Sequence, residues 1–275
     1  MKKTRPTALL AVFLVAIAAL VIAGCGGSDD ETTSAGGASE GGGETLAVGS
    51  DIPYPPFEQG KAPNYEGFDI DLMEAIAENI GRTAEFQDTS FDTIFRDLAQ
   101  GKFDAVASAT TITDEREKSV DFTNPYYLSE QAILVEEGSD IDSVEALAGT
   151  KVGVQQGTTG EEYSEANAEA DEVRTFPGGS DAVNALKAGT VDAVVIDIPV
   201  AENAVEAGGG IEISAAVPTE EEYGFAVAQD ETELLEELNE GLKQAIDDGT
   251  YATIYEKWFK HEPPAAIESA THEAS

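Results

Sequence analysis

One α/β pattern occurs twice in this chain. The segment LAQGKFDAVASAT begins at Leu98, and the similar segment LKAGTVDAVVIDI begins at Leu186. Each predicts the end of a helix, a glycine that stops it, and a short strand that ends in polar residues. Each also follows a strand with a glycine-containing loop, at Val48 and at Val152. Two copies of one plan favour an α/β protein with two similar lobes, although two unrelated units could also match by chance.

Apolar periodicity predicts further elements around the two copies. We expect strands over 45–48, 151–155 and 192–196, and helices over 67–81, 91–100, 142–147, 157–168, 181–188, 231–248 and 251–259. In the first of these helices, apolar side chains recur on one face and Gly81 follows the end. The alternation of strands and helices again indicates the α/β class.

Polar residues follow four of the expected strand ends. In open α/β sheets, ligands bind beyond the carboxyl ends of the strands. We expect four such ends to face one another: Asp51, Ala109–Thr111, Gln155–Thr159 and Asp197. These ends predict a binding site between the two lobes.

The charged groups near these ends are complementary. Arg116 lies five residues past Thr111, and its planar fork of donors suits a carboxylate. Asp197 suits an ammonium group, so a zwitterion would fit between the two. Tyr54 and Phe91 could flank an apolar or planar stem.

A simpler interpretation exists for each of these residues. Thr113 could cap a helix that leaves Arg116 in solvent. Both aromatic residues fall at ordinary core positions, and Asp51 or Asp69 could be a helix or turn cap.

The N-terminus is typical of a bacterial lipoprotein. A basic region is followed by an apolar run over 8–23, shorter than the ~20 residues that a membrane-spanning helix needs. Cys25, the only cysteine, follows a small-residue cleavage site as in a lipobox. We predict a signal peptide over 1–25 and a flexible acidic Gly/Ser linker over 26–44. The alternative is an ordinary signal peptide whose cleavage leaves a free cysteine.

The chain is strongly acidic, with a formal net charge of −39. This charge argues against nucleic acid or anionic lipid as an electrostatic partner. We therefore expect contact with a membrane only through an N-terminal lipid. The acidity would also fit a saline habitat, where salt screens the repulsion.

Nearly the whole folded part, from Thr45 to Phe259, resembles the family 3 extracellular solute-binding proteins, the amino-acid receptors of ABC importers. The motifs that carry the resemblance are GFDIDL at Gly67, TITDER at Thr111, VDFTNPYY at Val120, VGVQQGTTG at Val152, VDAVVID at Val191, EYGFAV at Glu222 and GTYATIYEKWF at Gly249. The resemblance implies the type II periplasmic-binding-protein-like fold, with two α/β lobes and a two-segment hinge. Lobe I would comprise 45–128 and 224–262, lobe II 129–223, and a C-terminal tail 263–275.

The resemblance also implies roles for individual residues. The residue matching Arg116 binds the ligand α-carboxylate, and the residue matching Asp197 binds the α-amine. The full set of expected ligand-binding residues is Asp51, Tyr54, Asp69, Phe91, Ala109, Thr111, Arg116, Gln155, Thr159 and Asp197. Ala109 departs from the more usual glycine or serine, and Gln155 replaces a lysine that contacts the ligand in glutamine receptors.

We therefore expect a monomeric, lipid-anchored, extracytoplasmic receptor that delivers an amino acid to an ABC transporter permease by hinge closure. Arginine, lysine, histidine or glutamine is the favoured ligand, and no cofactor or metal is expected. The alternatives are a sensor or scavenger without a transporter, and a cyclohexadienyl-dehydratase-like enzyme. Both histidines, His261 and His272, lie in or near the tail, so an enzyme would need a carboxylate such as Asp197 or Glu161 as its proton carrier.

Overall fold

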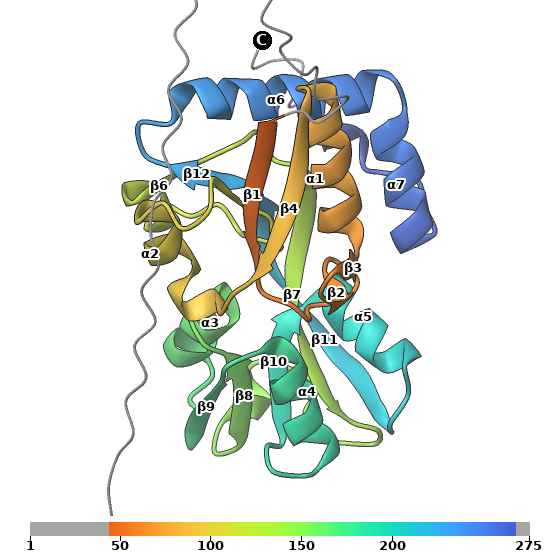
Figure 1. Ribbon diagram of the computed structural model, residues 1–275. Helices are drawn as coiled ribbons and strands as arrows, with labels where there is room; N and C mark the ends of the chain where they lie inside the picture. The colour runs from red at the N-terminus through yellow and green to blue at the C-terminus, as the bar shows by residue number, and fades with distance from the viewer. Residues whose placement is uncertain (1–43, 268–275) are drawn as a thin grey trace, which may run out of the picture. The chain divides into compact units, whose positions relative to one another are not determined.

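The computed structural model describes residues 44–267, which form two lobes, each built on a five-stranded mixed sheet (Figure 1). The predicted signal peptide, Cys25 and the linker up to residue 43 lie outside the described residues. The predicted two-lobed α/β architecture is confirmed. No helix within 44–267 has the length and hydropathy needed to cross a bilayer.

The sheet of the first lobe has the strand order β4-β1-β5-β12-β6. Its strands are β1 Glu44–Ser50, β4 Arg82–Asp88, β5 Ala105–Val106, β6 Val120–Phe122 and β12 Ala226–Ala228. β1 pairs in parallel with β4 and β5, and β12 runs antiparallel to β5 and β6. The helices of this lobe are α1 Phe68–Asn79, α2 Ile94–Ala99, α6 Thr232–Asp247 and α7 Thr250–Phe259. α1 packs on β4 with α6 and α7 beside it, while α2 contacts β1, β5 and β12.

The sheet of the second lobe has the order β11-β7-β10-β8-β9. Its strands are β7 Tyr127–Glu136, β8 Lys151–Gln155, β9 Glu172–Phe176, β10 Ala193–Asp197 and β11 Ile211–Tyr223, and its helices are α3 Thr159–Asn167, α4 Gly179–Lys187 and α5 Ile198–Glu206. β8 is parallel to β9 and β10, whereas β7 is antiparallel to β10 and β11.

The chain passes between the two sheets twice. It leaves the first sheet after β6 and enters the second at β7, then returns between β11 and β12. The ends of β7 and β11 pair at Tyr127 and Tyr223, so the two crossings lie side by side. A bulge between Val217 and Glu221 interrupts the same pair of strands.

A cluster of aromatic rings packs the last helix against these crossings. The Phe68 side chain is fully buried, and its ring lies 5.0–6.2 Å from those of Phe57, Tyr126, Tyr127, Tyr251, Tyr255 and Phe259. Tyr251 Oη donates a hydrogen bond of 2.8 Å to the backbone oxygen of Tyr126. Edge-on ring pairs of this kind add to the free energy of burial. The cluster therefore fixes the first crossing to the first lobe.

Most helices lie where the periodicity predicts them, but some elements differ. The segment 91–100 is a 3₁₀ turn, Phe91–Thr93, followed by α2, and only Glu145–Leu147 is helical in the segment 142–147. The strands β4, β6, β7, β9, β11 and β12 and the helix α5 were not predicted, nor was the small hairpin of β2 Gln59–Lys61 and β3 Asn64–Glu66. Ile267, in the predicted C-terminal tail, is buried in the main core.

Candidate functional site

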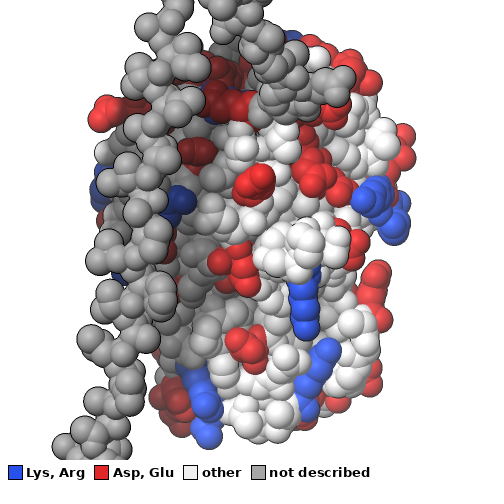
Figure 2. All heavy atoms as spheres, in the orientation of Figure 1, with Lys and Arg blue, Asp and Glu red and all other residues white. Residues whose placement is uncertain are grey.

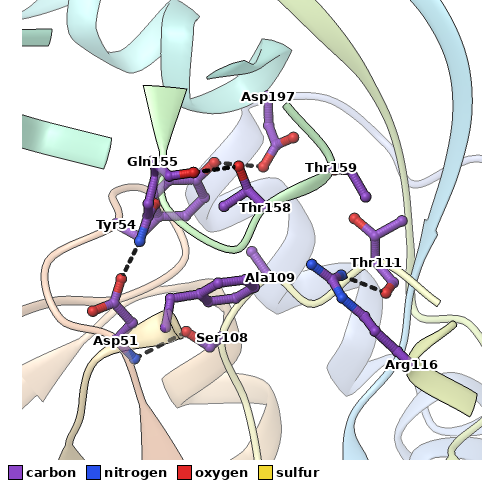
Figure 3. A pocket seen from close by; sticks show the side chains of 11 residues that line it. Asp51, Tyr54, Ser108, Ala109, Thr111, Arg116, Gln155, Thr158, Thr159 and Asp197 are labelled. Carbon is purple, nitrogen blue, oxygen red and sulfur yellow. Dashed lines mark hydrogen bonds between the residues drawn. The ribbon is translucent and has the colours of Figure 1, made fainter. Parts of the chain in front are cut away.

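A pocket lies between the carboxyl ends of strands from both sheets (Figure 3). Its lining residues are Asp51, Tyr54, Phe91, Ser108, Ala109, Thr111, Arg116, Gln155, Thr158, Thr159 and Asp197. β1 and β5 end on one side of it, and β8 and β10 end on the other. The repeated α/β pattern thus brings four polar strand ends together, as expected for open α/β sheets.

Arg116 is held in place by carbonyl oxygens and aromatic rings. Its Nη1 donates to the backbone oxygen of Thr111 at 2.7 Å, and its Nη2 donates to that of Gly157 at 3.2 Å. The guanidinium carbon lies 5.3 Å from the ring centre of Phe91 and 5.1 Å from that of Phe95. Burial lowers the pKa of Arg116 while nearby acids oppose the shift, and a guanidinium stays charged at neutral pH.

The turn that carries Arg116 is shorter than the helix considered from the sequence. Arg116–Lys118 form a single 3₁₀ turn, and Thr113 Oγ1 accepts from the Arg116 amide at 3.2 Å. The Thr113 hydroxyl therefore does bond to this turn, although Glu115 is its N-cap, and the arginine side chain points into the pocket instead of into solvent (Figure 3).

Asp197 faces the pocket from the end of β10. Its Oδ2 accepts a hydrogen bond of 2.5 Å from Tyr54 Oη, and its Oδ1 accepts one of 2.5 Å from Gln131 Nε2. Burial, and then the charge of Glu221, raise the pKa of Asp197 to about 7, although these hydrogen bonds oppose the shift. A cation placed here would favour the ionised carboxylate.

Asp51 provides a second acidic group in the pocket. It accepts a hydrogen bond of 2.5 Å from Gln155 Nε2, and its amide donates to Ser108 Oγ at 2.9 Å. Burial raises the pKa of Asp51 to about 7, and the hydrogen bond from Gln155 partly offsets the shift. Gln155 therefore engages the carboxylate across the pocket.

Several hydrogen bonds join the lobes directly around the pocket. Tyr54 bonds to Asp197, Asp51 to Gln155, and Arg116 to Gly157. The cavity they leave has a volume of about 10 Å³, which is about the room needed by one water molecule. An amino acid can therefore enter only if the lobes separate or these contacts rearrange.

Asp69 lies beneath the pocket and does not line it. Its side chain is fully buried, and Oδ2 accepts from the Ala109 amide and from Tyr126 Oη, both at 2.7 Å. Ala109 has a φ of 44°, a left-handed conformation that is unusual for a residue with a side chain. Asp69 thus stabilises the backbone turn at which the pocket begins.

Four polar residues at or near the site were not predicted: Glu58, Ser108, Gln131 and Glu221. Glu58 is fully buried and accepts from Ser108 Oγ at 2.9 Å. Glu221 is the middle residue of three successive glutamates, and both of its neighbours are exposed. Because side chains alternate along a strand, this triplet could have indicated one inward-facing acid.

Residues 46–261 match the family model of the bacterial extracellular solute-binding proteins, family 3. The chain belongs to this family. The match includes both lobes and every residue of the pocket.

Relatives of this family 3 protein include binding proteins with solved structures. The ABC transporter glutamine-binding protein GlnH of Bacillus subtilis (strain 168) is 36% identical over 202 residues, covering 72% of this chain and 74% of GlnH. An ancestral arginine-binding protein bound to arginine is 43% identical, with a TM-score of 0.75 over 78% of this chain and 98% of that one. The arginine-, lysine-, histidine-binding protein ArtJ from Geobacillus stearothermophilus is 33% identical, with a TM-score of 0.77 over 82% of this chain and 100% of ArtJ.

In this family 3 protein, Gly179 allows the two lobes to approach. A Cβ atom at Gly179, the first residue of α4, would lie 2.6 Å from Tyr54 Cε2 on the other lobe. Gly179→Ala should therefore weaken ligand binding, because the closed arrangement would require Tyr54 to move. Isothermal titration calorimetry measures the dissociation constant, and small-angle scattering measures compaction on adding ligand.

Gly178→Ala is the matched control for this variant. A Cβ atom at Gly178 would meet only Asp181 of the same helix, at 3.5 Å. Equal affinities of the two variants would contradict the role assigned to the contact between Gly179 and Tyr54.

Proposed function

We propose that this protein is the extracytoplasmic receptor of an amino-acid ABC importer and that it binds a basic or polar amino acid between its lobes. The observation that carries the proposal is the placement of Arg116 and Asp197 in one pocket, each reached from a different sheet (Figure 3). One group suits the α-carboxylate and the other the α-ammonium of a free amino acid. Hydrogen bonds between the lobes enclose the same pocket.

The carboxylate would bind to Arg116 and to the start of α3. The guanidinium has donors beyond the two that meet carbonyl oxygens. Thr158 caps α3, so the amide of Thr159 is among the first amides of the helix, which have no partner within it. Such amides favour a bound anion.

The ammonium would bind to Asp197. Tyr54 Oη now donates to this carboxylate, so the ligand would compete with a hydrogen bond between the lobes. Phe91 and the Tyr54 ring would flank the ligand side chain, and Asp51 with Gln155 would meet its polar end.

The charges of the site favour a cationic side chain. Asp51 and Asp197 line the pocket and Glu221 lies next to it, whereas Arg116 is the only basic residue of the lining. Acidic side chains also spread over the face of the protein seen in Figure 2. Such a field attracts cations and weakens as salt is added. Among the relatives, arginine-binding proteins and ArtJ bind ligands of this charge.

Binding would proceed by hinge closure. Within residues 44–267 the chain crosses between the sheets at two adjacent places, and the two lobes carry opposite ends of the proposed ligand site. An amino acid would be held by one lobe first and enclosed by the other, the hinge motion described for periplasmic binding proteins.

A binding protein, and not an enzyme, is proposed. Asp51 and Asp197, the two carboxyl groups with a pKa of about 7 in the pocket, are each hydrogen-bonded across the lobes and match the cationic groups of a ligand. Turnover of a cyclic amino-acid precursor such as arogenate would contradict this assignment. Loss of amino-acid uptake on deletion of the gene would separate an importer subunit from a scavenger.

A thermal-shift screen of the twenty amino acids tests the proposed function. A ligand at 100 times its dissociation constant should raise the free energy of unfolding by roughly 2.7 kcal/mol. We expect arginine, lysine, histidine or glutamine to give the largest shift. The tightest binding by glutamate or aspartate would contradict the polarity assigned to the pocket.

Arg116→Ala should weaken binding of the preferred amino acid by ~2–5 kcal/mol, because a buried carboxylate would lose its partner. This range corresponds to roughly 30-fold to several-thousand-fold in the dissociation constant. Arg116→Lys should restore only part of the affinity, since an ammonium lacks the planar fork. Titration calorimetry on both variants measures the effect, and an alanine variant within about threefold of wild type would refute the assignment.

Affinity for L-arginine should rise with pH up to about neutrality. The pKa values of Asp51 and Asp197 are about 7, and a cation binds their ionised forms, so binding at lower pH must release protons. For each proton released on binding, the dissociation constant should fall by up to about tenfold for each unit by which the pH rises toward 7. Asp51→Asn should therefore reduce the pH dependence of the dissociation constant, leaving the part due to Asp197. A pH-independent dissociation constant for the wild-type protein would argue against this linkage.

We also propose that Cys25 carries a lipid that anchors the protein outside the cytoplasm. The lipobox-like sequence and the strongly acidic chain, which an anionic bilayer repels, support a covalent anchor. Cys25→Ser should move the protein from the membrane fraction to the soluble fraction, or leave the signal uncleaved. Mass spectrometry that finds an unmodified Cys25 on the mature wild-type protein would contradict the proposal.

A further inference from the structure

A buried glutamate on β11 connects residues of both lobes at the pocket. Glu221 is only 5% exposed, and three side chains donate hydrogen bonds to its carboxylate. Oε2 accepts from Thr111 Oγ1 at 2.7 Å and from Thr159 Oγ1 at 3.2 Å, and Oε1 accepts from Gln131 Nε2 at 2.9 Å. Glu221 is therefore bonded to two of the three pocket threonines, Thr111 and Thr159, which come from different lobes.

Gln131 extends this network to Asp197. Its Nε2 also donates to Asp197 Oδ1, so one amide group bridges the two carboxylates. Gln131 is 1% exposed, and its Oε1 lies 3.0 Å from the position that a Cβ atom of Gly160 would occupy. Because carboxylates only accept hydrogen bonds, the NH₂ group must face Asp197 and Glu221. Thr111, Glu221, Gln131 and Asp197 thus form one continuous chain of hydrogen bonds.

The network determines the direction of the threonine hydroxyl groups. Each hydroxyl has one hydrogen, and in this structure that hydrogen is directed to Glu221. The hydroxyl oxygens of Thr111 and Thr159 can therefore only accept hydrogen bonds from a molecule in the pocket. An acceptor suits an ammonium group and not a carboxylate.

We infer that Glu221 is a positioning residue that makes this pocket specific for ligands with an α-ammonium group. The inference rests on the proposed amino-acid binding and deepens it. Glu221 acts in two ways: it turns the two hydroxyls into acceptors, and it places a second negative charge beside Asp197. It does not line the pocket, so its effect on a ligand passes through Thr111, Thr159 and Gln131.

Glu221→Gln reverses this arrangement with little change in size. The new amide oxygen would accept from Gln131, so its NH₂ group would face the two threonine oxygens and donate to them. The hydroxyl hydrogens would then be free to point into the pocket, where they oppose an ammonium. The variant also removes one negative charge from the site.

The test compares L-arginine with 5-guanidinopentanoate, which is arginine without its α-amino group. Titration calorimetry should show that Glu221→Gln weakens binding of L-arginine by about tenfold or more, the scale of one nearby charge and one reversed hydrogen bond. Binding of 5-guanidinopentanoate should stay within about threefold of wild type. Glu222→Gln, at the exposed neighbouring position on β11, should leave both affinities unchanged.

Equal weakening of both ligands by Glu221→Gln would overturn the inference, because a purely structural role does not distinguish them. No weakening of either would overturn it as well. If Glu221→Gln does not fold, Thr111→Val provides a second test. This variant should also weaken binding of L-arginine more than binding of 5-guanidinopentanoate. An equal effect on both ligands would refute the inference. A wild-type protein that binds none of the twenty amino acids would instead refute the proposed function, and this inference with it.

Discussion

A buried charge needs a partner, and at this site the partners come from both lobes. Removing a carboxylate or guanidinium from water costs several kcal/mol, and only well-placed hydrogen bonds or an opposite charge offset that cost. Asp197 is bonded to Tyr54 of the other lobe, and Asp51 is bonded to Gln155. The same groups that hold the lobes together are those proposed to meet the ligand. Opening the pocket and exchanging these partners are therefore one event.

The fold brings these partners together through the repeated α/β unit. Each lobe places polar residues at the carboxyl ends of its parallel strands, and the paired crossings allow these ends to face each other. The aromatic cluster around Phe68 fixes the first crossing to the lobe that carries Arg116. Rigid lobes with two adjacent connections favour a motion concentrated at the connections, because densely packed cores resist deformation.

The sequence was sufficient to predict the two-lobed fold and the strand ends that form the pocket. Asp197 and the residues Ala109–Thr111 follow short apolar runs, so their positions could be inferred from the pattern of one strand each. For Arg116 the local pattern left a solvent-exposed position open, and the resemblance to family 3 indicated the pocket. β7 and β11 were missed as strands. The segment of β11, 211–223, ends in polar and glutamate-rich sequence that gives no clear alternation of apolar residues. Glu221 and Gln131 were missed for a different reason: their burial depends on the pairing of β7 with β11, two distant segments of the chain. Asp69 was expected among the ligand-binding residues, but the first turn of α1 directs it to the Ala109 amide beneath the pocket.

The acids beneath the pocket stabilise the positive φ of Ala109, a position where the family resemblance implies that glycine or serine is more usual. A non-glycine residue at positive φ costs of order 1 kcal/mol or more, and persists where its surroundings fix it. Here the Ala109 amide donates to Asp69, and the adjacent Ser108 hydroxyl donates to Glu58. Burial raises the pKa of both acids, to about 7 for Asp69, and the charge of Asp69 raises that of Glu58 further. Full ionisation of this pair is thus disfavoured. The protonation states of Glu58 and Asp69 therefore depend on each other. Both acids accept hydrogen bonds from the turn at Ser108 and Ala109, and this turn links them to the pocket.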